Sequence, residues 1–109
     1  MKLFLIFWKT LISEIQKYSQ KEENNIEEET VKETIKILEK AKADFKRLVL
    51  LCVKGKLTPD ELEWLIQANE NLGEIVMLRQ KGWTKENLHN FLDYLYMTIS
   101  CTIAKTLDN

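Results

Sequence analysis

Apolar residues recur at every third or fourth position along most of the chain, which is the spacing of one face of an α-helix. The pattern is interrupted at a few turn-forming residues, namely Gly55, Pro59, Gly73 and Gly82. The stretches between these residues predict four helices, which span about 2–21, 25–54, 58–80 and 84 onward. The periodicity therefore predicts an all-α protein.

Capping signals place the starts of three of these helices. Thr58 as N-cap, Pro59 at the first helical position and Glu61 three residues after the cap predict a capping box at the start of the third helix. Thr84 has the same place before the fourth helix, and Asn25 before the second. The sequence thus defines where helices begin better than where they end.

Gly73 lies inside the third predicted helix. One glycine costs about 1 kcal/mol in a helix, so we expect the helix to continue through it, and a break at Gly73 is the alternative. Four helices joined by short turns predict an antiparallel four-helix bundle. A chain of 109 residues fits one domain, so residues 1–109 are expected to form a single helical domain.

The charge balance does not favour a polyanionic partner. The 16 Lys and Arg residues against 17 Asp and Glu give a formal net charge of -1, which attracts neither nucleic acid nor an anionic membrane surface. The apolar run from Leu3 to Trp8 ends at Lys9, so it is too short for a secretory core or a transmembrane segment. Cys52 and Cys101 lie in apolar helical stretches, as is typical of thiols in a reducing compartment. We therefore expect a cytoplasmic protein.

Few residues are placed for catalytic or metal chemistry. His89 is the only histidine, and with two cysteines the chain does not reach the four Cys or His ligands of a structural zinc site. Glu86 and His89 form one Glu-x-x-His pair, whereas di-iron bundles use two. No glycine-rich phosphate loop is present. The sequence predicts no enzyme, no catalytic residue, no cofactor and no metal, with a catalytic or metal-binding bundle as one alternative.

A second alternative is DNA binding through residues 75–92. Gly82, Trp83 and Thr84 followed by an amphipathic helix resemble the turn and second helix of a helix-turn-helix module, and residues 75–81 would form its first helix. The second helix carries few positive charges for guanine or phosphate contacts, which weighs against this interpretation. A small DNA-binding regulator is therefore the runner-up function.

The last two predicted helices are apolar on two sides, which a peripheral helix of a small monomer does not need. The residues that fall outside the main apolar faces form the predicted interface: Leu3, Ile6, Leu50, Leu51, Trp64, Ile75, Tyr94, Met97 and Cys101. An irregular arrangement around one central helix would cover some of them within the chain. Otherwise a second molecule must cover them. The sequence therefore predicts a non-enzymatic protein-interaction module, an adaptor, inhibitor or structural subunit, that forms a homodimer or docks another protein.

Overall fold

The computed structural model of the chain describes residues 2–24 and 26–107, which contain helices and no strands. The α-helices are α1 (Lys2–Ser19), α2 (Glu28–Lys40), α3 (Lys42–Val53), α4 (Pro59–Gln67) and α5 (Lys85–Leu107). Two short 3-10 helices, η1 (Glu22–Asn24) and η2 (Leu72–Met77), lie between them. The all-α prediction is confirmed. The bundle of four continuous helices is not, because two of the predicted helices are each divided in two.

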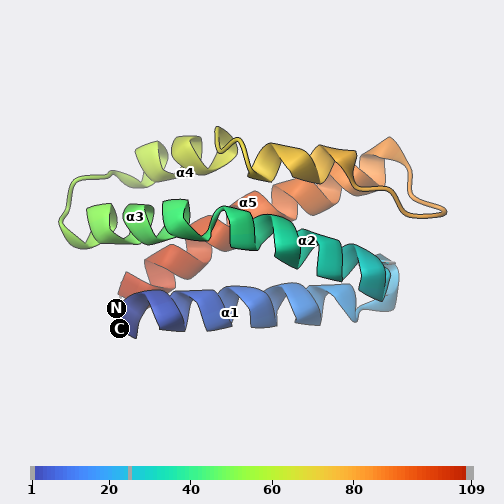
Figure 1. Cartoon of the computed structure of the whole chain (residues 1–109), viewed down its shortest axis with the longest axis horizontal. Coiled ribbons are helices and arrows are strands. Elements are labelled where there is room, and N and C mark those ends of the chain that lie inside the picture. The colour runs from blue at the N-terminus through green and yellow to red at the C-terminus, as the bar shows by residue number, and fades with distance from the viewer. Residues whose placement is uncertain (1, 25, 108–109) are drawn as a thin grey trace.

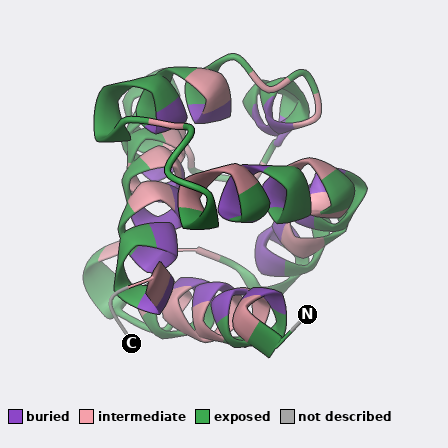
Figure 2. Ribbon diagram, turned by 90° about the vertical axis from the view of Figure 1, so that its left-hand side faces the viewer, coloured by how far each residue is buried: buried purple, intermediate pink, exposed green. Residues whose placement is uncertain are grey.

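The helices lie in layers around α5 (Figure 1). α1 forms one edge, α2 and α3 follow one another along the middle, and α4 and η2 form the opposite edge. α5 runs behind these layers and packs against α1, α3, α4 and η2. The helices turn their buried residues toward the centre and their exposed residues outward (Figure 2). α5 is therefore the helix on which most of the core is assembled.

Residues at helical spacing form the core. α1 contributes Phe4, Phe7, Leu11 and Ile15, all at helical spacing. α5 contributes a longer stripe, and its buried residues are Phe91, Leu95, Thr98, Ile99, Thr102, Ile103 and Thr106. Thr106 is compatible with burial because its hydroxyl bonds to the helix backbone, donating to the Thr102 carbonyl at 2.8 Å.

The helix predicted over 25–54 is broken at Ala41. The Ala41 backbone, at φ -89° and ψ 0°, ends α2, and its amide donates to the Leu38 carbonyl at 3.1 Å in a 3-10 step. The apolar stripe nevertheless stays buried across the break, from Leu38 through Ala41 to Phe45. The break has a packing consequence, because α2 packs against η2 whereas α3 packs against α5, and both contact α1. The predicted helical spacing of apolar residues holds across the break, whereas the predicted continuity of the helix is wrong.

The start of α2 is also set by tertiary contacts. The predicted cap, Asn25, lies outside the described residues, and the N-cap is Glu27, whose side chain makes no capping bond. Gln80, from the segment before α5, supplies the acceptor instead. Its Oε1 accepts hydrogen bonds from the Glu27 amide and the Thr30 hydroxyl, both at 2.8 Å. A distant side chain thus satisfies donors that a local cap was expected to satisfy.

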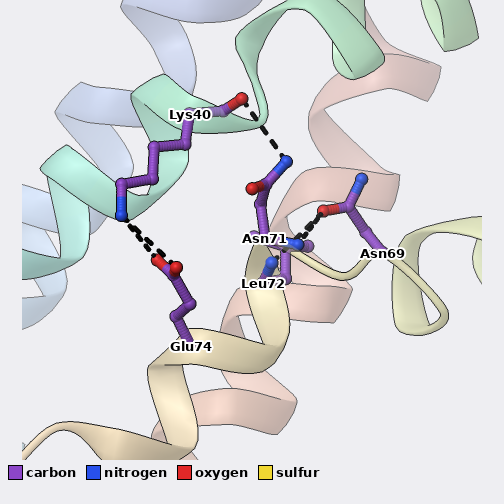
Figure 3. Close-up of polar contacts among 5 residues, drawn as sticks. All are labelled: Lys40, Asn69, Asn71, Leu72 and Glu74. Carbon is purple, nitrogen blue, oxygen red and sulfur yellow. Dashed lines mark hydrogen bonds and ion pairs between the residues drawn. The ribbon is translucent and has the colours of Figure 1, made fainter.

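The third predicted helix ends at Gln67 and does not reach residue 80. The chain turns at Asn69, whose side-chain oxygen accepts from the amides of Asn71 at 3.0 Å and Leu72 at 3.2 Å (Figure 3). Such asparagine turns offer the backbone an alternative to helical hydrogen bonds. Gly73 lies within η2, so it is neither a point of continuation nor the break.

The same turn is tied to the break between α2 and α3. The Asn69 side-chain amide donates to the Asp44 carboxylate at 3.0 Å. The Asn71 side-chain amide donates to the Lys40 carbonyl at 3.4 Å (Figure 3). Lys40 also pairs with Glu74 at 3.0 Å, although both of these side chains are largely exposed. The Asn69 turn therefore holds the α4 to η2 segment against the middle layer.

We expect Asn69→Ala to lower the free energy of unfolding by about 1–3 kcal/mol, because it leaves two part-buried backbone donors unsatisfied and removes the Asp44 contact. Glu74→Gln should cost less than about 1 kcal/mol, because the ion pair it removes is exposed to solvent. Urea unfolding followed by circular dichroism measures both. Equal losses for the two variants would contradict the role given to the turn.

Candidate docking groove

α4 begins with the capping box that the sequence predicts. Thr58 Oγ1 accepts from the Glu61 amide at 3.1 Å, and the Glu61 carboxylate accepts from the Thr58 amide at 3.0 Å, with Pro59 at the first helical position. The hydrogen bonds from the Thr58 backbone and side chain lower the pKa of the Glu61 carboxyl, so it keeps its charge into more acidic solution. The box fixes where α4 starts beside α5.

An apolar groove of about 370 Å³ lies between this end of α4 and the C-terminal half of α5. Leu57, Pro59 and Leu62 line it from the α4 side. Met97 and Cys101 line it from α5, and the neighbouring positions on both helices are mainly apolar too. Glu63 is the one charged carboxylate in this lining. The groove is therefore suited to an apolar partner segment and has little with which to hold a polar small molecule.

The α5 wall of the groove is the second apolar stripe of that helix. Met97, Cys101 and Ala104 follow one another at four- and three-residue spacing, and all three are exposed. The Met97 side chain remains 60% exposed. The core stripe of α5 packs against α1, α3, α4 and η2. The structure thus leaves Met97 and Cys101, two residues of the predicted interface, uncovered by the rest of the chain.

Tyr94 belongs to the same stripe in sequence, yet α1 covers it. Its ring stacks on Tyr18 with centroids 3.7 Å apart, and its hydroxyl donates to the Glu14 carbonyl at 3.0 Å. Burial raises the pKa of the Tyr94 hydroxyl above its ordinary value. Ile75 is a clearer correction, because η2 places it in the core with no exposed surface. These two residues do not form part of the open surface.

The other predicted interface residues are distributed over more than one surface. Leu3 and Leu51 are half-buried, and Ile6 on α1 and Leu50 on α3 are exposed away from the groove lining. Trp64 is 67% exposed and lines a separate hollow of about 310 Å³ with Asp60, Glu61 and Leu65. Of the nine residues, only Met97 and Cys101 line the groove.

Sequence reasoning missed Leu57 and Pro59 as groove residues, and Leu5, which is 55% exposed on α1. Leu57 and Pro59 flank the N-cap of α4 in the sequence. That position indicates the start of a helix and does not by itself indicate a place on an open groove. Leu5 lies beside Ile6 on the side of α1 away from its buried stripe, and helical spacing alone could have identified it.

Both cysteines line the groove and both are free thiols. Cys101 is exposed, whereas Cys52 is half-buried on α3. Burial raises the pKa of the Cys52 thiol, which reduces its thiolate fraction near neutral pH. The two thiols therefore line the same groove and differ in how far they are buried.

The residues considered for metal or DNA chemistry lie elsewhere. His89 and Asp93 pair at 3.3 Å on the exposed side of α5, and Glu86 is exposed one turn earlier. Within residues 2–24 and 26–107 no three His, Cys, Asp or Glu side chains are grouped so that they could hold a metal ion. Residues 75–81 lack the first α-helix of a helix-turn-helix, because η2 is a 3-10 helix that ends at Met77 and Leu78 is extended. No helix in the described part of the chain has the length and apolarity needed to cross a membrane.

Comparisons with protein-family models, with curated proteins and with solved structures find no match to this chain.

At low protein concentration and pH 8, we expect a thiol-reactive dye to label Cys101 rapidly and Cys52 slowly, because Cys101 is exposed and burial suppresses the Cys52 thiolate. Mass spectrometry of the labelled peptides assigns the two phases. Cys101→Ser should remove the fast phase alone. Equal labelling rates in the folded protein would show that the groove does not separate the two thiols as described.

Proposed function

We propose that the protein is a non-enzymatic helical interaction module that self-associates by docking apolar helix faces, with a dimer as its smallest assembly. The observation that carries this proposal is the open apolar groove between α4 and α5, in which Met97 stays 60% exposed. Soluble monomers rarely leave connected apolar surface open to water, so such a surface favours a partner.

Burial energetics support docking at this groove. Full burial of an exposed residue such as Met97 contributes roughly 1.5–3 kcal/mol, and the smaller exposed residues Pro59, Cys101 and Ala104 lie in the same lining. Part of that gain offsets the lost translational and rotational freedom of association, which costs at least about 4 kcal/mol. A groove of this size therefore supports weak to moderate self-association, and additional contacts beyond the groove would be required for a tight complex.

A second copy of this chain is the occupant we favour. Homo-oligomers are the commonest soluble assemblies, and every other copy in solution offers exposed aliphatic residues of its own, such as Leu5, Ile6 and Val53. We further propose a cytoplasmic location, where the free thiols Cys52 and Cys101 would stay reduced. In architecture, the molecule is best treated as a four-membered bundle in which α2 with α3, and α4 with η2, are each one bent member.

The test compares two exposed methionines. Met97→Glu places a charge in the groove and should weaken self-association at least about tenfold, because the docked state would bury an unpaired carboxylate. Met77→Glu is the matched control, since Met77 is 70% exposed on η2, away from the groove. Sedimentation equilibrium over a range of concentrations gives the dissociation constants. A wild-type mass that stays at the 12.9 kDa of the monomer up to millimolar concentration would refute the proposal.

A further inference from the structure

We infer that the second copy docks with the outer face of its α1 against α4 and the groove, so that the contact joins two different faces of the molecule. This inference rests on the proposed self-association and names the surface that enters the groove. It is carried by opposite charges on α1 and α4, each set beside exposed apolar side chains.

The outer face of α1 is positively charged. Lys2, Lys9 and Lys17 are exposed on it, and the one acidic residue of the helix, Glu14, is half-buried toward α5. Leu5 and Ile6 lie between Lys2 and Lys9 at three- and four-residue spacing. Their side chains are 55% and 48% exposed. The face is therefore a short apolar patch flanked by lysines.

α4 has the opposite charge. Asp60, Glu61 and Glu63 are all exposed, and the helix contains no Lys or Arg. The apolar surface lies on both sides of this acidic helix, with Met97 in the groove on one side and Trp64 in the hollow on the other. Glu63 lines the groove, and Asp60 and Glu61 line the hollow. An incoming helix thus meets carboxylates beside each apolar surface.

The two faces match in charge and in polarity. Leu5 and Ile6 of one copy would lie on the groove of the other, while its lysines approach the α4 carboxylates. Exposed ion pairs add little affinity, so the charges mainly set the orientation and the rate of docking, and the apolar contact supplies the stability. Within the chain, Lys42 Nζ lies 4.6 Å from the centre of the Trp8 ring, which is a cation–π contact. Trp64 offers the same kind of contact to a lysine of the second copy.

A basic helix with exposed aliphatic residues also suits an anionic membrane surface, but the burial pattern favours the protein partner. The large apolar residues of α1, such as Phe4, Phe7 and Leu11, are in the core. An interfacial helix instead turns a broad apolar face with its aromatic residues toward the lipid. Leu5 and Ile6 alone provide a patch small enough to fit a groove.

α1 and α4 lie at opposite edges of the molecule (Figure 1), and the start of α1 is at the lower edge in the second view as well (Figure 2). A contact between two different faces is heterologous, and it leaves one α1 face and one α4 face free in a dimer. The assembly should therefore grow beyond a dimer as the concentration rises.

The experiment uses two charge variants of the full chain. The α1 variant carries Lys2→Glu and Lys9→Glu, and the α4 variant carries Asp60→Asn and Glu63→Lys, which leaves the Thr58 and Glu61 capping box intact. Each alone should self-associate at least about tenfold more weakly than the wild type, because like charges meet at the contact. An equimolar mixture should recover the wild-type affinity, because the intact α1 face of one variant meets the intact α4 face of the other, and the two changed faces are again opposite in charge.

Matched controls separate this contact from a general charge effect. Glu39→Lys and Lys36→Glu make the same changes at exposed positions of α2 and should leave association unchanged. Circular dichroism checks folding, and if the α1 variant is unfolded, Lys2→Gln with Lys9→Gln replaces it. A wild type that associates while both variants associate equally well would overturn this inference and leave the proposed self-association standing. A wild type that stays monomeric but binds phosphatidylserine vesicles would overturn both.

Discussion

The structure depends on one constraint: the chain has a single interior, and α5 is the helix that most of its elements share. α1, α3, α4 and η2 all pack against α5, and together they cover the stripe that includes Phe91, Leu95 and Ile99. A helix can bury its whole circumference only if neighbours surround it. No described element lies over Met97 and Cys101, so the apolar character of α5 exceeds what the chain itself covers. The groove, the proposed self-association and the docking of α1 all follow from this excess.

Much of the fold could be predicted from the sequence, because its signals are local. Helical periodicity identified the buried faces of α1, α2 with α3, and α5, and the Thr58 capping box was correct to the residue. These local signals could not predict that two of the expected helices are divided. The bonds that accompany those divisions, from Asn69 to Asp44 and from Asn71 to Lys40, join residues far apart in the chain. A periodic pattern does not reveal such partners.

The candidate site was predictable only in part, for a related reason. Tyr94 and Met97 both lie off the core stripe of α5, and periodicity does not distinguish them. Tyr94 stacks on Tyr18 and donates a hydrogen bond to the Glu14 carbonyl, both on α1, whereas Met97 stays 60% exposed. Ile75 was assigned to a face of a long helix, and it is buried because that helix ends and η2 begins. Which of two equivalent apolar faces stays open is decided by the placement of neighbouring helices.

If a second molecule covers the open side of α5, the alkylation rate of Cys101 must depend on the protein concentration. Cys101 is exposed in the single chain and lines the groove, so it reports on the occupied state without a substitution. We expect the rate to fall as the concentration passes through the dissociation constant, while an unfolded control shows no change. A rate that stays constant from micromolar to millimolar protein would show that no second molecule covers this side of α5.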